Sequence, residues 1–286
     1  MTITSATEDM ALSEVREIEW DTMNYPVRMR GLFILPLDYQ AGIPYPLIID
    51  IHGGGSGASL QLDGAILVST PLEWQMWAAK GYAVFVPEFR SSGAFGGLAD
   101  TRDHYEQHDL INQDIVDIET GVNKLISDGF IAPDRMAVIA HSAGARRANW
   151  LIATRHEFRA VVSKEGWADE LHAVSNPIQA YPLNRVYQHF GGSPQEVPEN
   201  YLKNSALHYA KDVTVPTLFL MANPELGGID LAGTVKLFSD VIKSKNVETE
   251  LIFYPDEGHV FENVSNRLDA LKRSQEWIGK HTQSKK

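Results

Sequence analysis

The sequence of 286 residues contains no cysteine, which excludes disulfide bonds and thiolate metal sites. It also has no continuous apolar run of about 18 residues, so no membrane-spanning helix is expected. Residues 1–15 lack the basic start followed by an apolar block that marks a secretory signal. These absences make the cytoplasm the default expectation for the location of the protein.

Basic residues are in the minority, since 25 Lys and Arg stand against 37 Asp and Glu, for a formal net charge of −12 at pH 7. Nucleic acids and anionic membranes bind surfaces on which Lys and Arg cluster, so neither is expected as a partner. Such an acidic balance is typical of a solvated protein surface. The 44% of apolar residues are enough for a large core, and the length suits a single α/β domain over residues 1–286.

The apolar residues fall into short runs that predict a mostly parallel sheet of about eight strands. Two runs near the start, 15–20 and 27–36, are typical of antiparallel strands joined by a turn. The later runs are continuous and bounded by Gly, Pro or Asp, as in strands buried on both faces. These later runs are 46–52, 82–89, 135–141, 159–166, 217–223 and 249–255.

Helical patterns alternate with these runs, which predicts a doubly wound α/β fold with helices on both faces of the sheet. The expected helices are 71–81, 110–129, 143–156, 232–245 and 262–278. Residues 167–212 interrupt the alternation with four prolines and no clear strand, and so predict a cap or lid insertion. Ligands of such a sheet bind outside the carboxyl ends of its strands.

The stretch Ala140-His141-Ser142-Ala143-Gly144 lies between a predicted strand and a predicted helix. It matches the nucleophile-elbow pattern G-x-S-x-G except that Ala140 takes the first position. Small residues are needed on both sides of the serine because the strand and helix backbones pass close together there, and alanine adds only one methyl group. The pattern predicts Ser142 as a nucleophile, with a plain helix N-cap as the alternative.

A nucleophilic serine needs a base and an orienting acid, which follow it in the order acid, then histidine, on this type of fold. His259 lies in the loop after the last predicted strand, within FYPDEGHVF. Two carboxylates, Glu225 and Asp230, follow the preceding predicted strand, 217–223. The shorter distance from the end of that strand favours Glu225 over Asp230. Asp256 and Glu257, although nearer to His259 in sequence, are interpreted as surface loop residues.

The Gly-rich stretch IHGGGSGAS (51–59) follows another predicted strand, where an oxyanion donor is expected. The candidate oxyanion donors are the backbone N–H groups of Gly54, Gly55 and Ala143. The same glycines could cradle a phosphate, but the chain has neither G-x-G-x-x-G nor G-K-[ST], so nucleotide binding is not favoured.

Several other side chains have weaker functional interpretations. Trp167, Tyr181 and Tyr187 are expected to line an aromatic substrate pocket, with ordinary packing of the cap as an equal alternative. His141 is interpreted as a packing residue that points away from the site, and Arg146 and Arg147 as exposed. The stretch HYEQH (104–108) lacks the H-E-x-x-H spacing, so no metal is expected.

These motifs occur in an order that resembles the α/β-hydrolases, and specifically the catalytic domain of the prolyl oligopeptidase family of serine peptidases. The matching stretches are PYPLIIDIHGGG, GYAVFVPEFRSSGAFG, DIVDIETGVNKLISDGFIAPDRMAVIAHSAGA, VYQHFGGSPQE, VPTLFLMAN and YPDEGHVF. The resemblance implies a triad of Ser142, Glu225 and His259. The chain departs from the family at Ala140, for glycine, and at Glu225, for aspartate. It is also expected to lack the N-terminal β-propeller and the tyrosine that donates to the oxyanion in some members.

The resemblance implies a serine hydrolase that cleaves an ester or amide bond through an acyl-enzyme and needs no cofactor. It leaves peptidase and carboxylesterase open, with a short peptide or a small-molecule ester as substrate, and it leaves a homo-oligomer open. A non-catalytic ligand-binding relative is the alternative from another class, and the three filled triad positions favour the enzyme.

Overall fold

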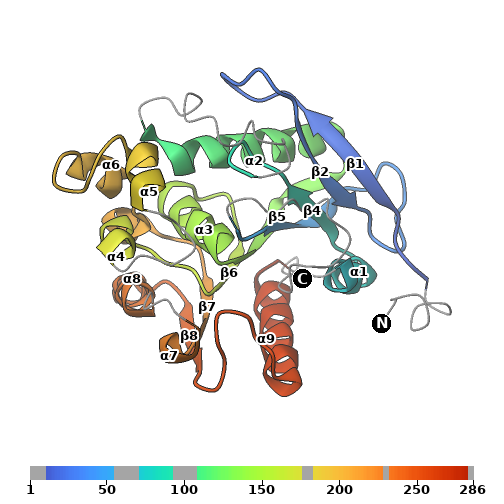
Figure 1. The fold of residues 1–286 in the computed structure, drawn as a ribbon. Helices are drawn as coiled ribbons and strands as arrows, with labels where there is room; N and C mark the ends of the chain where they lie inside the picture. The colour runs from blue at the N-terminus through green and yellow to red at the C-terminus, as the bar shows by residue number, and fades with distance from the viewer. Residues whose placement is uncertain (1–10, 55–70, 93–107, 176–182, 228–231, 283–286) are drawn as a thin grey trace.

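The structure is a computed structural model that describes residues 11–54, 71–92, 108–175, 183–227 and 232–282. Its centre is one eight-stranded sheet with the strand order β1-β2-β4-β3-β5-β6-β7-β8 (Figure 1). The strands are β1 (Val15–Trp20), β2 (Met29–Ile34), β3 (Tyr45–Ile51), β4 (Ala83–Pro87), β5 (Ile131–His141), β6 (Ala160–Lys164), β7 (Thr217–Ala222) and β8 (Thr249–Tyr254). The predicted sheet of about eight strands is confirmed.

The strand directions match the two kinds of apolar run. β1 pairs with β2, and β2 with β4, in antiparallel register, whereas β3 to β8 run parallel to one another. All residues of β4 and β7 are buried, as continuous apolar strands in a parallel sheet require. β3 pairs with β4 on one side and with β5 on the other, so the strand order reverses there. A crevice at such a reversal is the usual ligand site of an open α/β sheet.

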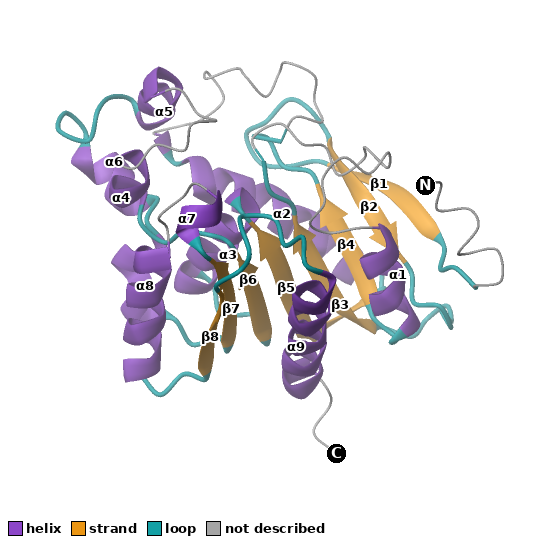
Figure 2. Ribbon diagram, turned by 60° about the horizontal axis from the view of Figure 1, so that its bottom comes forward, coloured by secondary structure: helices purple, strands orange, loops and turns teal. Residues whose placement is uncertain are grey.

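Helices cover both faces of the sheet (Figure 2). One core cluster joins the sheet to α2 (Leu110–Ser127), α3 (Ala143–Thr154) and α8 (Ala232–Ser244). The other joins it to α1 (Pro71–Ala79) and α9 (Val264–Thr282). None of the described helices is both long and apolar enough to cross a membrane.

The segment predicted as a cap, 167–212, is helical in its described part. It contains α4 (Glu170–Ser175), α5 (Leu183–Phe190), α6 (Pro198–Lys203) and the 3-10 helix η6 (Ala206–Asp212). The ring centroids of Phe190 and Tyr201 stack 4.2 Å apart in a small core of this segment. A single turn, α7 (Pro224–Gly227), follows β7.

Candidate active site

Ser142 occupies the sharp turn between β5 and α3, as the sequence pattern predicts. Its φ of 55° and ψ of −125° lie in a region that residues other than glycine rarely adopt. The turn is held by its backbone, because the Ser142 N–H donates to Lys164 O at 2.9 Å and the Ser142 carbonyl accepts from Arg146 N at 3.0 Å. Strain of this kind persists only where the surroundings determine it, and it concentrates at functional sites.

The small residues around the turn are required by close backbone contacts. A Cβ on Gly144 would lie 2.0 Å from the carbonyl oxygen of Ile51, at the end of β3. A Cβ on Gly53 would lie 2.9 Å from the Cβ of Ser142. Ala140 is 1% exposed and pairs in register with Ile51, so its methyl group fits the core where the elbow pattern has glycine.

His259 meets the nucleophile, although 117 residues separate the two in sequence. Its Nε2 lies 2.8 Å from Ser142 Oγ. When Nε2 carries no proton, the serine hydroxyl donates to it, which is the geometry that a general base requires. The predicted Ser–His pair therefore comes together in the structure.

The carboxylate next to the base is that of Glu165 and not that of Glu225. Glu165 Oε2 lies 3.5 Å from His259 Nδ1. Glu225 lies in α7 with an exposed side chain, and its backbone N–H donates to Asn223 Oδ1 at 3.0 Å. The structure thus does not bring Glu225 to His259, because the chain turns into α7 directly after β7 and leaves that side chain in solvent. The alternative acid, Asp230, lies outside the described residues.

Two of the three predicted oxyanion donors fall in the described part of the chain. Ala143 is the first residue of α3, where a backbone N–H has no partner within the helix. Gly54 is exposed and has a φ of 80°, which only glycine adopts without strain. Gly55 lies outside the described residues. The preceding His52 is held by Glu88, whose Oε2 lies 3.2 Å from His52 Nε2.

The loop that carries His259 is fixed by two buried side chains, and both correct the sequence interpretation. His141 does not simply pack, because its Nε2–H donates to the carbonyl oxygen of His259 at 2.9 Å. Burial lowers the pKa of His141 to about 3, so its imidazole stays neutral. Glu257 is 2% exposed and no surface residue, because its carboxylate accepts from Glu262 N at 2.7 Å and Asn266 Nδ2 at 2.8 Å.

The arginines after the elbow are not exposed as predicted, because Arg147 is buried and the side chain of Arg146 is only 13% exposed. Arg147 pairs with the fully buried Asp114 at 2.8 Å and thereby fastens α3 to α2. Arg146 pairs with Glu170 at 2.8 Å, and its guanidinium lies 5.3 Å from the ring centroid of Trp167. The Trp167 N–H donates to Glu170 at 2.9 Å, so the indole is fixed at both its face and its edge.

The predicted aromatic pocket is only partly assembled in the described residues. Trp167 is buried and packs against Ala143, next to the nucleophile. Tyr187 packs instead with Phe190 and Tyr201 in the small core of the cap segment. Tyr181, like residues 104–107 of the HYEQH stretch, lies outside the described residues.

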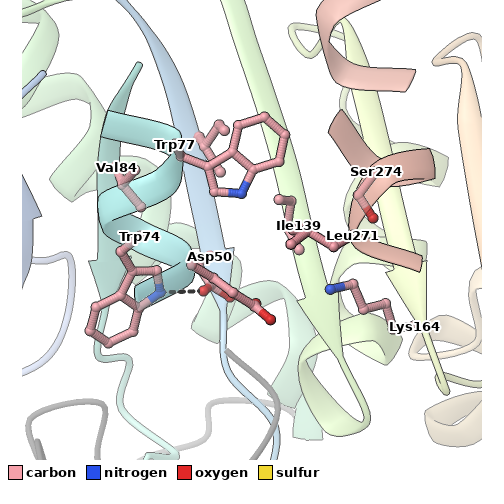
Figure 3. A pocket seen from close by; sticks show the side chains of 10 residues that line it. Asp50, Trp74, Trp77, Val84, Ile139, Lys164, Leu271 and Ser274 are labelled. Carbon is pink, nitrogen blue, oxygen red and sulfur yellow. Dashed lines mark hydrogen bonds between the residues drawn. The ribbon is translucent and has the colours of Figure 1, made fainter. Parts of the chain in front are cut away.

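Two small cavities, each lined by both polar and apolar side chains, lie on the α1 and α9 side of the sheet. Figure 3 shows the first, where the Trp74 indole N–H donates to Asp50 Oδ2 at 2.6 Å and Lys164 points in from β6. The second cavity shares Glu73 and Lys164 with the first and is also lined by His141 and by Val260, the residue after His259. Burial raises the pKa of Glu73. Ser142 lines neither cavity, so neither is the substrate pocket of the proposed nucleophile.

Comparisons with known proteins agree on one family. The model of the prolyl oligopeptidase family matches residues 68–285. An uncharacterized peptidase of Bacillus subtilis, YuxL, is 26% identical over 94% of this chain and 39% of its own length. Dipeptidyl-peptidase 5 of Aspergillus fumigatus is 24% identical over 87% of this chain and 33% of its own length.

Solved structures show the same fold. Uncomplexed acylaminoacyl peptidase of Pyrococcus horikoshii has a TM-score of 0.81 at 21% identity, over 98% of this chain and 44% of that one. A puromycin-hydrolyzing peptidase of Mycobacterium tuberculosis has a TM-score of 0.80 at 18% identity, over 97% of this chain and 41% of that one. The chain therefore spans less than half the length of each of these proteins.

Proposed function

The chain belongs to the prolyl oligopeptidase family, and from this premise we propose that it hydrolyses an ester or amide bond through an acyl-enzyme on Ser142. The observation that carries the proposal is the 2.8 Å contact between Ser142 Oγ and His259 Nε2 at the carboxyl edge of the sheet. A serine hydroxyl is a weak nucleophile by itself, and this contact supplies the base that activates it. The expected serine hydrolase agrees with the names of the relatives, which are peptidases.

The reaction proceeds in two displacements. Ser142 Oγ attacks the substrate carbonyl carbon while its proton passes to His259 Nε2, and the tetrahedral oxyanion accepts hydrogen bonds from the N–H groups of Ala143 and Gly54. Collapse of this intermediate breaks the bond to the leaving amine or alcohol, which takes the proton from His259. A water molecule then gives its proton to His259 and attacks the acyl carbon, and a second collapse releases the acid and restores the Ser142 hydroxyl.

The described elements of segment 167–212 support its proposed role as a cap. The two ends of the segment are joined, because Leu207 N donates to Ala168 O at 2.8 Å and Glu170 N donates to Ser205 Oγ at 2.9 Å. The segment thus leaves the sheet and returns beside its starting point, close to Trp167 and the elbow. A cap in that place selects short acyl or aminoacyl groups by size, which fits the relatives named for dipeptides, acylated amino acids and puromycin.

The test compares Ser142→Ala with Ser163→Ala on matched p-nitrophenyl esters and aminoacyl p-nitroanilides. Ser163 is a suitable control because it is fully buried in β6 and its hydroxyl has no hydrogen-bond partner in the described part of the chain. We expect S142A to lose about 10³-fold or more in kcat and S163A to retain activity. Full activity in S142A would contradict the proposed nucleophile. Turnover of the esters alone would make the protein a carboxylesterase, and a folded wild type without any turnover would favour the ligand-binding alternative.

A further inference from the structure

We propose that Glu165, at the carboxyl end of β6, is the positioning residue that orients His259, and that it replaces the acid expected after β7. This inference rests on the proposed function, since it assigns the third member of the same catalytic site. Its basis is the 3.5 Å separation of Glu165 Oε2 and His259 Nδ1. Nδ1 is the nitrogen opposite the one that contacts Ser142, so a carboxylate there fixes the ring in the productive orientation and tautomer.

The carboxylate of Glu165 is held in place by the neighbouring strand. Its second oxygen, Oε1, accepts a hydrogen bond from the backbone N–H of Ala222 at the end of β7. The side chain is only 11% exposed, so few water molecules compete for it. One oxygen is thus anchored to the sheet, and the other is left facing the imidazole.

The backbone of Glu165 has a positive φ, as that of the nucleophile does. Its φ is 53°, beside 55° for Ser142, and neither residue is glycine. The two are linked through β6, because Lys164 O accepts from Ser142 N at 2.9 Å while Glu165 N donates to Leu220 O at 3.0 Å. A positive φ is uncommon for a residue other than glycine and concentrates at functional sites, and at Glu165 it accompanies a carboxylate that lies beside the base.

The described polar side chains directly after β7, those of Asn223 and Glu225, contact the loop that carries His259 or lie in solvent. Asn223 makes two hydrogen bonds to the loop that carries His259. Its backbone N–H donates to Glu257 O at 3.0 Å, and its side-chain amide donates to Pro255 O at 3.1 Å. Its Oδ1 accepts from the N–H of Glu225, whose own side chain is exposed in α7. The described residues after β7 therefore secure the loop that carries His259, and the described carboxylate that faces the imidazole comes from the adjacent strand.

The distance of 3.5 Å exceeds the 2.7–3.2 Å of an ordinary N–H···O hydrogen bond. Catalytic hydrogen bonds are often long in the free enzyme and tighten when substrate binds. The charge that develops on His259 as it takes the proton of Ser142 draws the carboxylate closer, because a charge-assisted N–H···O bond is shorter and stronger than a neutral one. A shift of a few tenths of an ångström is sufficient to bring Glu165 Oε2 within hydrogen-bond distance of His259 Nδ1.

The experiment compares Glu165→Gln with Glu225→Gln, which remove the same charge from the two glutamates among the three candidate acids. Glutamine keeps an oxygen for the Ala222 N–H, so E165Q is expected to fold. We expect E165Q to lower kcat by about 10²–10⁴-fold with little change in KM, and E225Q to leave both within about twofold. A second variant, E165G, places glycine at a positive φ and is expected to fold and to lose kcat to a similar extent.

A spectroscopic measurement separates this inference from the proposed function. In the wild type at low pH, the Nδ1 proton of His259 should give a far-downfield NMR resonance through its carboxylate partner. That resonance should persist in E225Q and S142A and vanish in E165Q. Its presence in E165Q, or equal kcat in E165Q and E225Q, would overturn the role of Glu165. A wild type that shows the Glu165-dependent resonance but no turnover would contradict the proposed function alone.

Discussion

Replacing Gly144 by alanine is predicted to disrupt the nucleophile elbow more than its single methyl group suggests. The added Cβ would lie 2.0 Å from Ile51 O and 2.6 Å from His52 O. Real Cβ atoms essentially never approach a heavy atom closer than 3.0 Å, so α3 and the end of β3 must separate by about 1 Å. Both neighbours are backbone atoms and cannot rotate away as a side chain would.

The expected magnitude follows from that displacement. Overpacking of a core typically costs about 1–3 kcal/mol of unfolding free energy, and the backbone contacts place G144A at the upper end of this range. Ser142 is two residues away and its carbonyl accepts a hydrogen bond from Arg146 N in α3, so it moves when the helix moves. A misplacement of about 1 Å lowers the rate by about 10²-fold.

The assay combines urea unfolding with kcat/KM for a p-nitrophenyl ester. Gly233→Ala is the matched control, because Gly233 is the second residue of α8 as Gly144 is of α3, and nothing lies within 4 Å of its added Cβ. G233A should be neutral or stabilised by up to about 1 kcal/mol, with full activity. Equal stability and activity in the two variants would refute the claim that close backbone contact dictates the glycine of the elbow.

Three further predictions concern the surroundings of the site. The pKa of His141 is about 3 in the folded protein and 6.5 in the unfolded chain. Between these two values the unfolded chain binds one more proton than the folded protein, so the free energy of unfolding falls as the pH falls from 6.5 towards 3. The slope is about 1.4 kcal/mol per pH unit, and urea unfolding from pH 4.5 to 7.5 should show this contribution in the wild type and not in H141Q. Asp117→Asn should cost about 3–5 kcal/mol in thermal or urea unfolding, because it leaves the buried Arg90 guanidinium, now 2.7 Å from Asp117 Oδ1, without its counter-charge. Trp167→Ala should lower the discrimination between large and small acyl groups by about tenfold in kcat/KM, because it removes the fixed indole that packs against Ala143.

Each of these predictions has an outcome that contradicts it. An identical pH slope in the wild type and H141Q would mean that His141 is not buried in neutral form. A loss below about 1 kcal/mol in D117N would show that water reaches the ion pair. An unchanged acyl preference in W167A would remove the indole from the substrate pocket and leave it a packing role.

The fold could be predicted because its signals are local. Continuous apolar runs bounded by Gly, Pro or Asp fix buried strands such as β4 and β7, and the stripe of Ile111, Ile115 and Ile118 fixes the buried face of α2. Ser142 and His259 could be paired because both follow strands whose carboxyl ends meet at one edge of a parallel sheet.

The carboxylates of the site could not be assigned in this way, because their roles depend on backbone turns and tertiary burial. Glu165 falls inside the apolar run 159–166, and no sequence pattern there predicts a positive φ at the residue that follows β6. Glu257 has the composition of a surface turn, and only the return of the chain into α9 buries it. Arg147 looks like an exposed helix residue until α2 brings Asp114 to it.

Labelling with a fluorophosphonate tests the central claim most directly, because the reagent forms a covalent adduct only with an activated serine. Intact-mass measurement of the folded wild type should show one adduct per chain, peptide mapping should place it on Ser142, and S142A should stay unlabelled while S163A labels like the wild type. An adduct on another residue, or equal labelling of S142A, would contradict the account.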